Sequence, residues 1–244
     1  MSIAKELQNA TTQLCEKLEP ITFSEPVTHV YNPLTYARDS HDQYLIRFGN
    51  TRKRVLFLGM NPGPWGMAQT GVPFGEIAAV RDWMGITALV GKPVKEHSKR
   101  PVEGFECGRS EVSGRRLWGL FAEKYQNAGS FFSENYVANY CPLVWMEEGG
   151  KNRTPDKLPK AEMEVVAEAC DRYVLRHIEL MEPEFVVGVG VYAENCFKRI
   201  CQDVGIHPKL GRILHPSPAS PAANRGWAGA ATKQLIDLGI WNPK

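Results

Sequence analysis

The sequence RVLFLGM at Arg54–Met60 is an apolar run that leads directly into a polar, proline-rich segment. Runs of this kind are typical of strands that are buried on both faces of a parallel sheet. Three later runs share this character, at Tyr136–Tyr140, Phe185–Val189 and Leu210–Leu214. Helical patterns separate the four runs, so the sequence predicts an α/β fold with helices on both faces of a parallel sheet.

The rest of the chain is predicted from its periodicity and its breaker residues. Helices are expected at residues 2–18, 75–84, 113–126, 160–181, 192–202 and 228–239. Connecting segments rich in proline, glycine or charge are expected at residues 31–36, 92–110 and 142–159. No internal repeat or linker interrupts the sequence, so residues 1–244 are predicted to form a single domain.

The composition indicates an ordinary globular protein of the cell interior. Of the 244 residues, 43% are hydrophobic and 23% are charged, and the net charge is +2. There is no run of 18 or more apolar residues and no apolar signal core near residue 1, so we expect neither a membrane partner nor secretion. The six cysteines contain no CxxC pair, which favours reduced thiols over a metal site.

Two segments far apart in the sequence have compositions that a globular core does not require. They are GMNPGPWGMAQTGVPFG at Gly59–Gly75 and HPSPASPAANRGW at His215–Trp227. Their glycines and prolines restrict the backbone to specific shapes. Each segment follows a predicted strand, and ligands of parallel-sheet proteins bind outside the carboxyl ends of the strands. We therefore expect the two loops to form opposite sides of one site.

The residues in and near the first loop suit the binding of a flat heterocycle. Asn61 can donate and accept hydrogen bonds, Gly63 leaves one face of the loop bare, and Phe74 is a fixed ring suited to stacking. Asn139 ends an apolar strand, where its amide can match the adjacent donor and acceptor of a nucleobase edge. The residues alone leave a structural alternative open, in which Phe74 fills the core and the asparagines stabilise turns.

The second loop has the composition of a rigid wedge on a basic surface. Its prolines hold the small residues between them in a stiff projection after His215, a form that can enter a groove or a base stack. No Asp or Glu occurs between Val204 and Ile236, and the run Lys151–Arg153 is predicted to be a second basic loop. Such a surface suits a polyanion, although a structural histidine beside a solvated surface stays an alternative.

A loose dinucleotide pattern is disfavoured. Gly188–Ala193 fits G-x-G-x-x-A after a predicted strand, but the fingerprint needs an acid about 20 residues later. No acid lies between Asp203 and Asp237. Close packing of a strand on a helix explains the glycines instead, and P-loop, zinc-protease and nucleophile-elbow motifs are absent. The sequence therefore favours a site made of amides, an imidazole and backbone dipoles, without a cofactor.

The two loops resemble motifs of the uracil–DNA glycosylase superfamily, and within it those of the single-strand-selective monofunctional uracil–DNA glycosylases. The segments YNPLTYA, SEVSGRRLWG, NYCPL and VVGVG follow in that family's order. The resemblance implies a three-layer α/β/α sandwich around a four-stranded parallel sheet. It implies a monofunctional glycosylase that flips out and hydrolyses uracil and 5-hydroxymethyluracil from DNA, leaving an abasic site, without metal or cofactor. We expect a monomer that acts on single- or double-stranded DNA. We expect it inside the cell, where the genome is.

The resemblance also assigns roles to residues. Asn61 would place the attacking water and His215 would stabilise charge on the leaving base, so these two are the expected catalytic residues. Substrate-binding roles are implied for Met60, Gly63, Phe74 and Asn139. Contacts with DNA are expected from Lys151, Asn152, Arg153, Ser217, Pro218, Ala219, Ser220, Pro221 and Arg225.

The sequence departs from the family pattern at three positions. Trp65 stands where phenylalanine is usual, and Ala219 and Ser220 replace larger residues at the tip of the wedge. A smaller tip predicts weaker invasion of intact duplex and a relative preference for single strands or mismatches. Three alternatives stay open: a glycosylase with another main base such as xanthine, a non-catalytic reader of damaged DNA, and an enzyme with a nucleotide cofactor at Gly188–Ala193.

Overall fold

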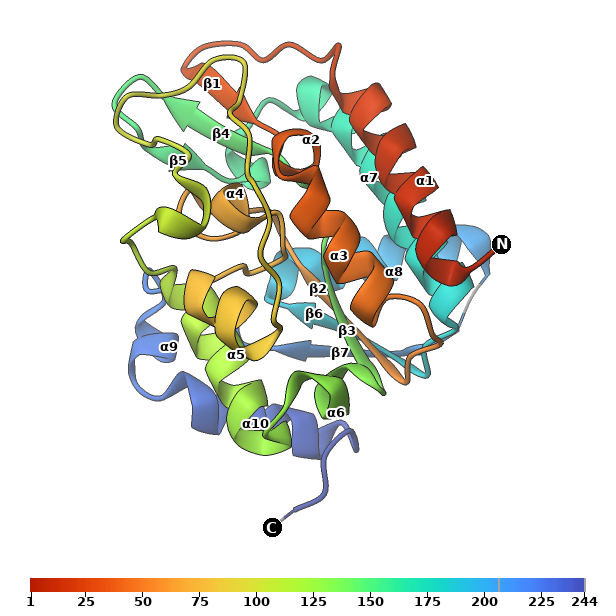
Figure 1. Cartoon of the computed structure of the whole chain (residues 1–244). Coiled ribbons are helices and arrows are strands. Elements are labelled where there is room, and N and C mark those ends of the chain that lie inside the picture. Colours follow the sequence, from red (N-terminus) through yellow and green to blue (C-terminus); the bar gives the residue numbers. More distant parts are fainter. Residues whose placement is uncertain (206, 244) are drawn as a thin grey trace.

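The computed structural model describes residues 1–205 and 207–243, and it has a parallel sheet at its centre (Figure 1). The strand order is β3-β2-β6-β7 and every neighbouring pair is parallel. The bounds are β2 Val55–Gly59, β3 Asn135–Asn139, β6 Phe185–Val189 and β7 Lys209–Ile213. The first three are buried throughout, as strands covered on both faces must be. The predicted four-stranded parallel sheet is therefore confirmed.

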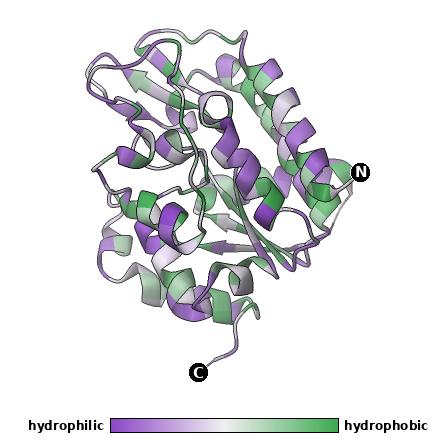
Figure 2. Cartoon of the chain, viewed as in Figure 1, coloured by the Kyte–Doolittle hydropathy of each residue, from purple (hydrophilic) through white to green (hydrophobic). Residues whose placement is uncertain are grey.

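Helices cover both faces of this sheet and complete three layers (Figure 1). On one side lie α7 (Lys160–Met181) and α8 (Val191–Val204), with α1 (Ile3–Leu18) packed on α7. On the other side lie α5 (Val112–Tyr125), α6 (Ala128–Phe132) and α10 (Trp227–Asp237). Figure 2 shows strongly apolar central strands and helix ribbons that alternate between polar and apolar residues. The apolar helix faces therefore bury the sheet.

Shorter elements connect these layers. The helices are α2 (Pro33–Tyr36), α3 (Arg38–Phe48), α4 (Met67–Thr70) and α9 (Pro221–Asn224). A π-helical turn spans Ala79–Trp83, and 3₁₀ turns span Gly104–Glu106 and Pro155–Lys157. The five long predicted helices agree with the structure to within a few residues. The helix expected at residues 75–84 is reduced to the π-helical turn, and α3 was not predicted from the sequence.

A second, antiparallel sheet corrects the sequence prediction. It has the order β1-β4-β5, formed by Val27–Tyr31, Val144–Glu147 and Asn152–Arg153. Residues 142–159 were predicted to be a loop, and Lys151–Arg153 a basic loop within it. The strands are too short to give a clear alternation, and β4 pairs with a strand more than 100 residues earlier. The segment is therefore a hairpin held by β1.

Two histidines are buried in the helical layer. His41 on α3 and His177 on α7 donate from Nδ1 to the carbonyls of Gly71 and Tyr173, at 3.0 and 2.9 Å. Burial penalises the charged form and lowers their pKa values from 6.5 to about 3 and about 4. Both rings are therefore neutral at physiological pH.

The described residues were also searched for membrane-spanning helices and for groups of side chains that could hold a metal ion. No described helix is long and apolar enough to cross a bilayer. All six cysteines are free, and no group of three or more His, Cys, Asp or Glu side chains among the described residues is placed to hold a metal ion.

Because two histidines are buried in the neutral form, we expect the free energy of unfolding of the chain to decrease in acid. Below about pH 6.5 the two histidines are protonated in the unfolded chain but stay neutral in the folded chain. As the pH falls, the free energy of unfolding therefore decreases by up to about 1.4 kcal/mol per pH unit for each histidine. Urea unfolding of wild type and His177→Phe checks this. The variant's stability relative to wild type should improve steadily from pH 7 to pH 5. The matched control replaces an exposed histidine, His207→Phe; equal trends in both variants would contradict the assignment.

Candidate active site

A cleft of about 310 Å³ opens at the carboxyl ends of the parallel strands. It brings together nine predicted residues from both loops, from β3 and from the β4–β5 hairpin: Met60, Asn61, Gly63, Phe74, Asn139, Asn152, His215, Ser217 and Pro218. The other six predicted residues lie outside its lining: Lys151, Arg153, Ala219, Ser220, Pro221 and Arg225. Residues of the two loops therefore line one cleft.

The floor of the cleft depends on Gly59, the last residue of β2. The parallel ladder places Gly59 directly beside Asn139. A Cβ at this position would lie 2.2 Å from Asn139 Oδ1 and 2.5 Å from the Phe74 ring. These separations are below any tolerable contact, so only glycine lets the amide and the ring close over the end of the strand.

Phe74 is held in a strained conformation. Its φ of 52° lies in the left-handed region, which costs a residue with a side chain about 1–3 kcal/mol. The Phe74 carbonyl accepts hydrogen bonds from Trp118 Nε1, at 3.0 Å, and from the Glu76 N–H, at 2.6 Å. Gly114 of α5 approaches the same carbonyl closely. The ring is 8% exposed and lines the cleft, so packing and hydrogen bonds fix a stacking surface there.

Asn139 presents an unpaired amide oxygen to the cleft. The residue is 7% exposed, and its Nδ2 contacts the thioether of Met67 at 3.3 Å. No described group donates a hydrogen bond to its Oδ1. Buried polar groups in folded proteins are nearly always hydrogen-bonded. This amide is therefore available to a ligand that offers a donor and an acceptor side by side.

Asn61 is oriented by the backbone of a neighbouring segment. Its Nδ2 donates to the Leu143 carbonyl at 3.1 Å and, more weakly, to that of Pro62 at 3.4 Å. Because the amide nitrogen is engaged, Oδ1 is the group left to accept a hydrogen bond in the cleft. The Met60 carbonyl before it accepts from the Cys141 N–H at 3.0 Å, which ties the start of the loop to the end of β3.

His215 lies two residues beyond β7 and is a neutral donor. The Ser217 N–H donates to its Nδ1 at 3.1 Å, so the proton of the neutral ring is on Nε2. Burial lowers the pKa of His215 from 6.5 to about 4. The ring centroid lies 6.2 Å from that of Phe74. At neutral pH the imidazole therefore offers an Nε2–H, which has no acceptor among the described residues.

The glycines that resemble a dinucleotide fingerprint have packing roles. A Cβ at Gly188 would lie 2.3 Å from the backbone nitrogen of Glu194, so this glycine lets β6 meet α8 closely. Gly190 has a φ of 95°, and a Cβ there would touch the His215 side chain at 3.1 Å. The strand-to-helix turn supports the histidine, which agrees with the packing explanation of this motif.

The wedge loop is clamped by hydrogen bonds. Arg116 of α5 donates to the Pro216 carbonyl and to Asn224 Oδ1, both at 2.9 Å, and Asn224 donates to the Pro218 carbonyl at 2.8 Å. Ser220 accepts from the Ala223 N–H at the start of α9. Pro218 and Ala219 are exposed at the tip. The loop is therefore a rigid projection with small side chains.

The predicted basic run Lys151–Arg153 lies at the β4–β5 hairpin. Arg153 pairs with Glu147 at 2.6 Å and donates to the Lys157 carbonyl, so its charge is compensated within the hairpin. Lys151 is exposed and lies 3.6 Å from the same carboxylate. Asn152 lines the cleft, and its buried Oδ1 has no hydrogen-bond partner.

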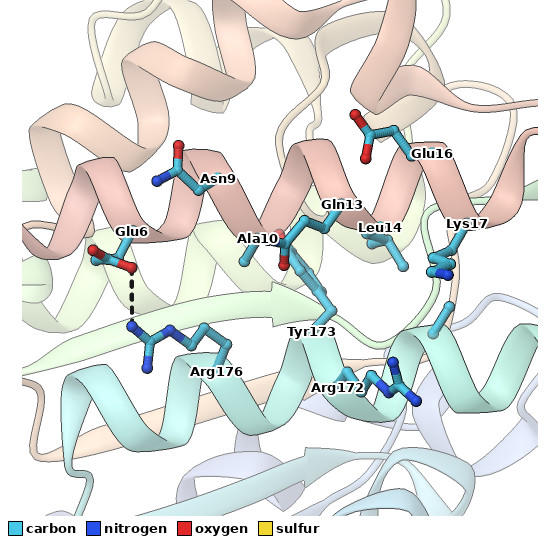
Figure 3. Close-up of a pocket in the computed structure, with 11 residues that line it drawn as sticks. Glu6, Asn9, Ala10, Gln13, Leu14, Glu16, Lys17, Arg172, Tyr173 and Arg176 are labelled. Atoms are coloured by element: carbon cyan, nitrogen blue, oxygen red, sulfur yellow. Dashed lines mark hydrogen bonds and ion pairs between the residues drawn. The ribbon is translucent and has the colours of Figure 1, made fainter.

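A larger groove, of about 530 Å³, lies between α1 and α7, away from the strand ends (Figure 3). Figure 3 shows the Glu6–Arg176 ion pair, at 2.9 Å, bridging the two helices. Acidic and basic side chains both line it, and none of the predicted site residues does. Its size alone does not make it a candidate, because the unpaired polar groups converge on the other cleft.

Comparison with known proteins identifies the family of this chain. The family model of the uracil DNA glycosylase superfamily matches residues 46–236. The chain belongs to the uracil-DNA glycosylase superfamily. It is 44% identical over 239 residues to the single-strand selective monofunctional uracil-DNA glycosylases of Rattus norvegicus and Bos taurus, covering 98% of this chain and 86% and 88% of those proteins.

A solved structure of the superfamily shares the fold. The crystal structure of wild-type Pedobacter heparinus SMUG2 superposes with a TM-score of 0.66 at 16% identity, over 98% of this chain and 96% of that chain. The predicted family and the predicted three-layer α/β/α fold are confirmed. Membership of the superfamily also confirms that the chain is an enzyme of the glycosylase class.

Five residues that line the cleft were not among the predicted site residues: Pro62, Met67, Glu111, Ser113 and Thr154. Glu111 caps α5 by accepting from the Ser113 N–H at 3.0 Å and from the Gly114 N–H. Burial raises the pKa of its carboxyl. Glutamate is not among the residues that ordinarily mark the start of a helix, so the sequence revealed neither this cap nor that the first turn of α5 faces the cleft.

Gly59→Ala should disable the cleft without unfolding the chain. The added methyl group must push the Asn139 amide and the Phe74 ring out of place, and a displacement of about 1 Å costs about 100-fold in rate. The excision rate on uracil-containing oligonucleotides and the thermal unfolding midpoint check this. Gly229→Ala is the matched control, because a Cβ there meets no atom within 4 Å. Equal rates for both variants would contradict the packing argument.

Proposed function

We propose that this chain hydrolyses the N-glycosidic bond between uracil and deoxyribose in DNA and leaves an abasic site. One observation carries the proposal: Asn61, Phe74, Asn139 and His215 line a single cleft, and their free polar atoms suit one pyrimidine. We further propose that residues 1–244 act as one domain and as a monomer, inside the cell with the genome.

Recognition of the base rests on a ring and an amide. Phe74 stacks on the flat face of the pyrimidine, a contact worth about 1–3 kcal/mol. Asn139 Oδ1 accepts from uracil N3–H, and its Nδ2 donates to O4. Cytosine presents an acceptor at N3 and donors at the 4-amino group, so both contacts fail. A buried amide left mispaired costs about 1–3 kcal/mol, which favours uracil.

Bond cleavage follows from charge stabilisation. As the C1′–N1 bond breaks, the sugar gains oxocarbenium character and uracil leaves as an anion with charge on O2. The neutral His215 donates its Nε2–H to that oxygen. Asn61 Oδ1 holds a water whose oxygen bonds to C1′, and a proton of that water balances the charge of the released base. Asn61 orients the water without deprotonating it, because an amide is not a base at neutral pH.

The same cleft favours a monofunctional enzyme. No lysine is among the residues that line it, so water is the nucleophile and the chain forms no Schiff base. The DNA strand therefore keeps its phosphodiester backbone at the product stage.

A target base must leave the stack before it reaches this cleft, at a cost of a few kcal/mol. The clamped loop from Pro216 to Pro221 fills the gap in the stack, with Pro218 and Ala219 at its tip. Because the tip is small, it gives little help against an intact pair. Single-stranded or mismatched uracil is therefore the preferred substrate.

The cleft also accommodates a 5-substituted uracil. Gly63 lines it, and a Cβ on Gly63 would meet no atom within 4 Å. The open space suits the hydroxymethyl group of 5-hydroxymethyluracil next to the loop.

Excision assays on matched oligonucleotides test the proposal. Uracil and 5-hydroxymethyluracil should be released, and alkali should reveal strand breaks that the enzyme alone does not make. His215→Ala should slow uracil release about 100–1,000-fold with DNA affinity nearly unchanged, because one preorganised donor to a developing anion is lost. Near-normal release by His215→Ala would overturn the role of the histidine. Binding of damaged DNA without release of any base would overturn the enzyme assignment.

The pH profile tests the state of His215. Because its pKa is about 4, the ring stays neutral down to mildly acidic pH and is protonated only as the pH approaches that value. The single-turnover rate should therefore show no break near pH 6.5, the ordinary pKa of histidine. A break near pH 6.5 that disappears in His215→Ala would contradict a neutral donor. Circular dichroism at each pH separates this effect from acid unfolding.

A further inference from the structure

Five arginines that lie in the segment before α5, on α5 or beside the wedge form no ion pair with a carboxylate among the described residues, unlike most arginines of the chain. Nine of the 15 arginines in the sequence form ion pairs with carboxylates. Among the described residues, no such pair is formed by Arg47, Arg100, Arg109, Arg115, Arg116 and Arg225. Arg47, near the end of α3, donates to the backbone carbonyls of Met84 and Gly85. The other five lie in the segment before α5, on α5 itself, or beside the wedge.

Two of these arginines are gathered on one ring. The Cζ atoms of Arg109 and Arg100 lie 4.6 and 5.3 Å from the centroid of the Trp65 ring. Trp65 belongs to the loop that carries Asn61 and Gly63, and Arg109 comes two residues before Glu111, another residue of the cleft. The cluster of Trp65, Arg100 and Arg109 therefore adjoins the rim of the active site.

Arg100 also connects this cluster to the β4–β5 hairpin. Its Cζ would lie 3.5 Å from a Cβ at Gly150, and its Nη1 donates to the Lys99 carbonyl at 2.9 Å. Its buried Nε has no hydrogen-bond acceptor, which agrees with a guanidinium that rests on an indole face. Arg109 is exposed. One arginine is thus set into the surface, and the other faces solvent.

The electrostatics of the cluster favour an anionic ligand. Two guanidinium groups over one ring repel each other, and neither forms an ion pair with a carboxylate among the described residues. Cation–π attraction to Trp65 holds them together, and apart from the bond of Arg100 Nη1 to the Lys99 carbonyl it leaves in-plane N–H groups available to a ligand. A guanidinium with free in-plane donors matches the oxygens of a phosphodiester.

We infer that Trp65, Arg100 and Arg109 form a phosphate clamp for the DNA strand that carries the target nucleotide. Arg109 and Arg100 bind backbone phosphate beside the extruded nucleotide, and Trp65 is a positioning residue that keeps the two guanidinium groups at the rim. The inference rests on the proposed function, because it takes DNA as the substrate. It assigns binding to the loop before α5, on a different segment from the wedge.

Binding measured without chemistry tests the clamp. The probe is a fluorescent single-stranded oligonucleotide with one tetrahydrofuran abasic-site analogue, and anisotropy gives Kd over a series of salt concentrations. Arg109→Gln and Arg100→Gln should each weaken binding about tenfold and reduce the slope of log Kd against log salt by about 0.7. Arg172→Gln on α7 (Figure 3) is the control of equal charge, since Arg172 is exposed and pairs with Glu168.

Trp65 variants separate positioning from folding. Trp65→Phe keeps an aromatic face and should bind nearly as wild type, whereas Trp65→Ala should weaken binding several-fold with an unchanged thermal midpoint. In single-turnover excision of uracil, the enzyme concentration for half-maximal rate should rise in Trp65→Ala and Arg109→Gln. Their maximal rate should stay as in wild type.

Some outcomes would overturn the clamp, and another would overturn the proposed function. Salt slopes for Arg109→Gln and Arg100→Gln equal to that of Arg172→Gln would overturn the clamp, as would a lower maximal rate with unchanged Kd. Wild-type protein that binds the probe but releases no uracil would overturn the proposed function. Reduced salt slopes for Arg109→Gln and Arg100→Gln would still support the clamp in that case. Failure of the clamp and failure of the proposed function are therefore distinguishable.

Discussion

The candidate site depends on how closely three segments approach one another at the end of β2. The ladder between β2 and β3 places Gly59 beside Asn139, and the missing Cβ lets the Asn139 amide and the Phe74 ring occupy the same corner. The recognition geometry is thus set by the most deeply buried strands of the molecule. A close-packed core resists displacement, so the ring and the amide hold their positions before any base arrives.

Polar groups in the cleft are without hydrogen-bond partners although they are shielded from water, which costs free energy. The Asn139 oxygen and the His215 Nε2–H have no partners among the described residues, and Phe74 is held in a strained backbone conformation. Each such feature costs about 1–3 kcal/mol in the free protein. Low local dielectric makes the same groups strong when a ligand pairs with them. Desolvation also keeps the imidazole neutral, which suits a donor to an anionic leaving group.

Charge around the cleft is distributed differently from charge elsewhere. Far from the site, arginines such as Arg172 and Arg176 are paired with carboxylates on the same or a neighbouring helix. Near the site, Arg116 is used to fix the wedge, while Arg100 and Arg109 rest on Trp65. A net charge of only +2 therefore conceals a local group of arginines that form no ion pair with a carboxylate among the described residues.

The parallel strands, the long helices and nine of the residues that line the cleft could be predicted from the amino-acid sequence. Apolar runs and helical periodicity are local signals, and the two polar loops follow strands whose carboxyl ends share one edge. Folding of the whole chain was needed to show that β4 pairs with β1, that Glu147 neutralises Arg153, that Glu111 faces the cleft and that His215 carries its proton on Nε2. These features depend on distances and solvent exclusion between segments, which no local pattern of residues encodes.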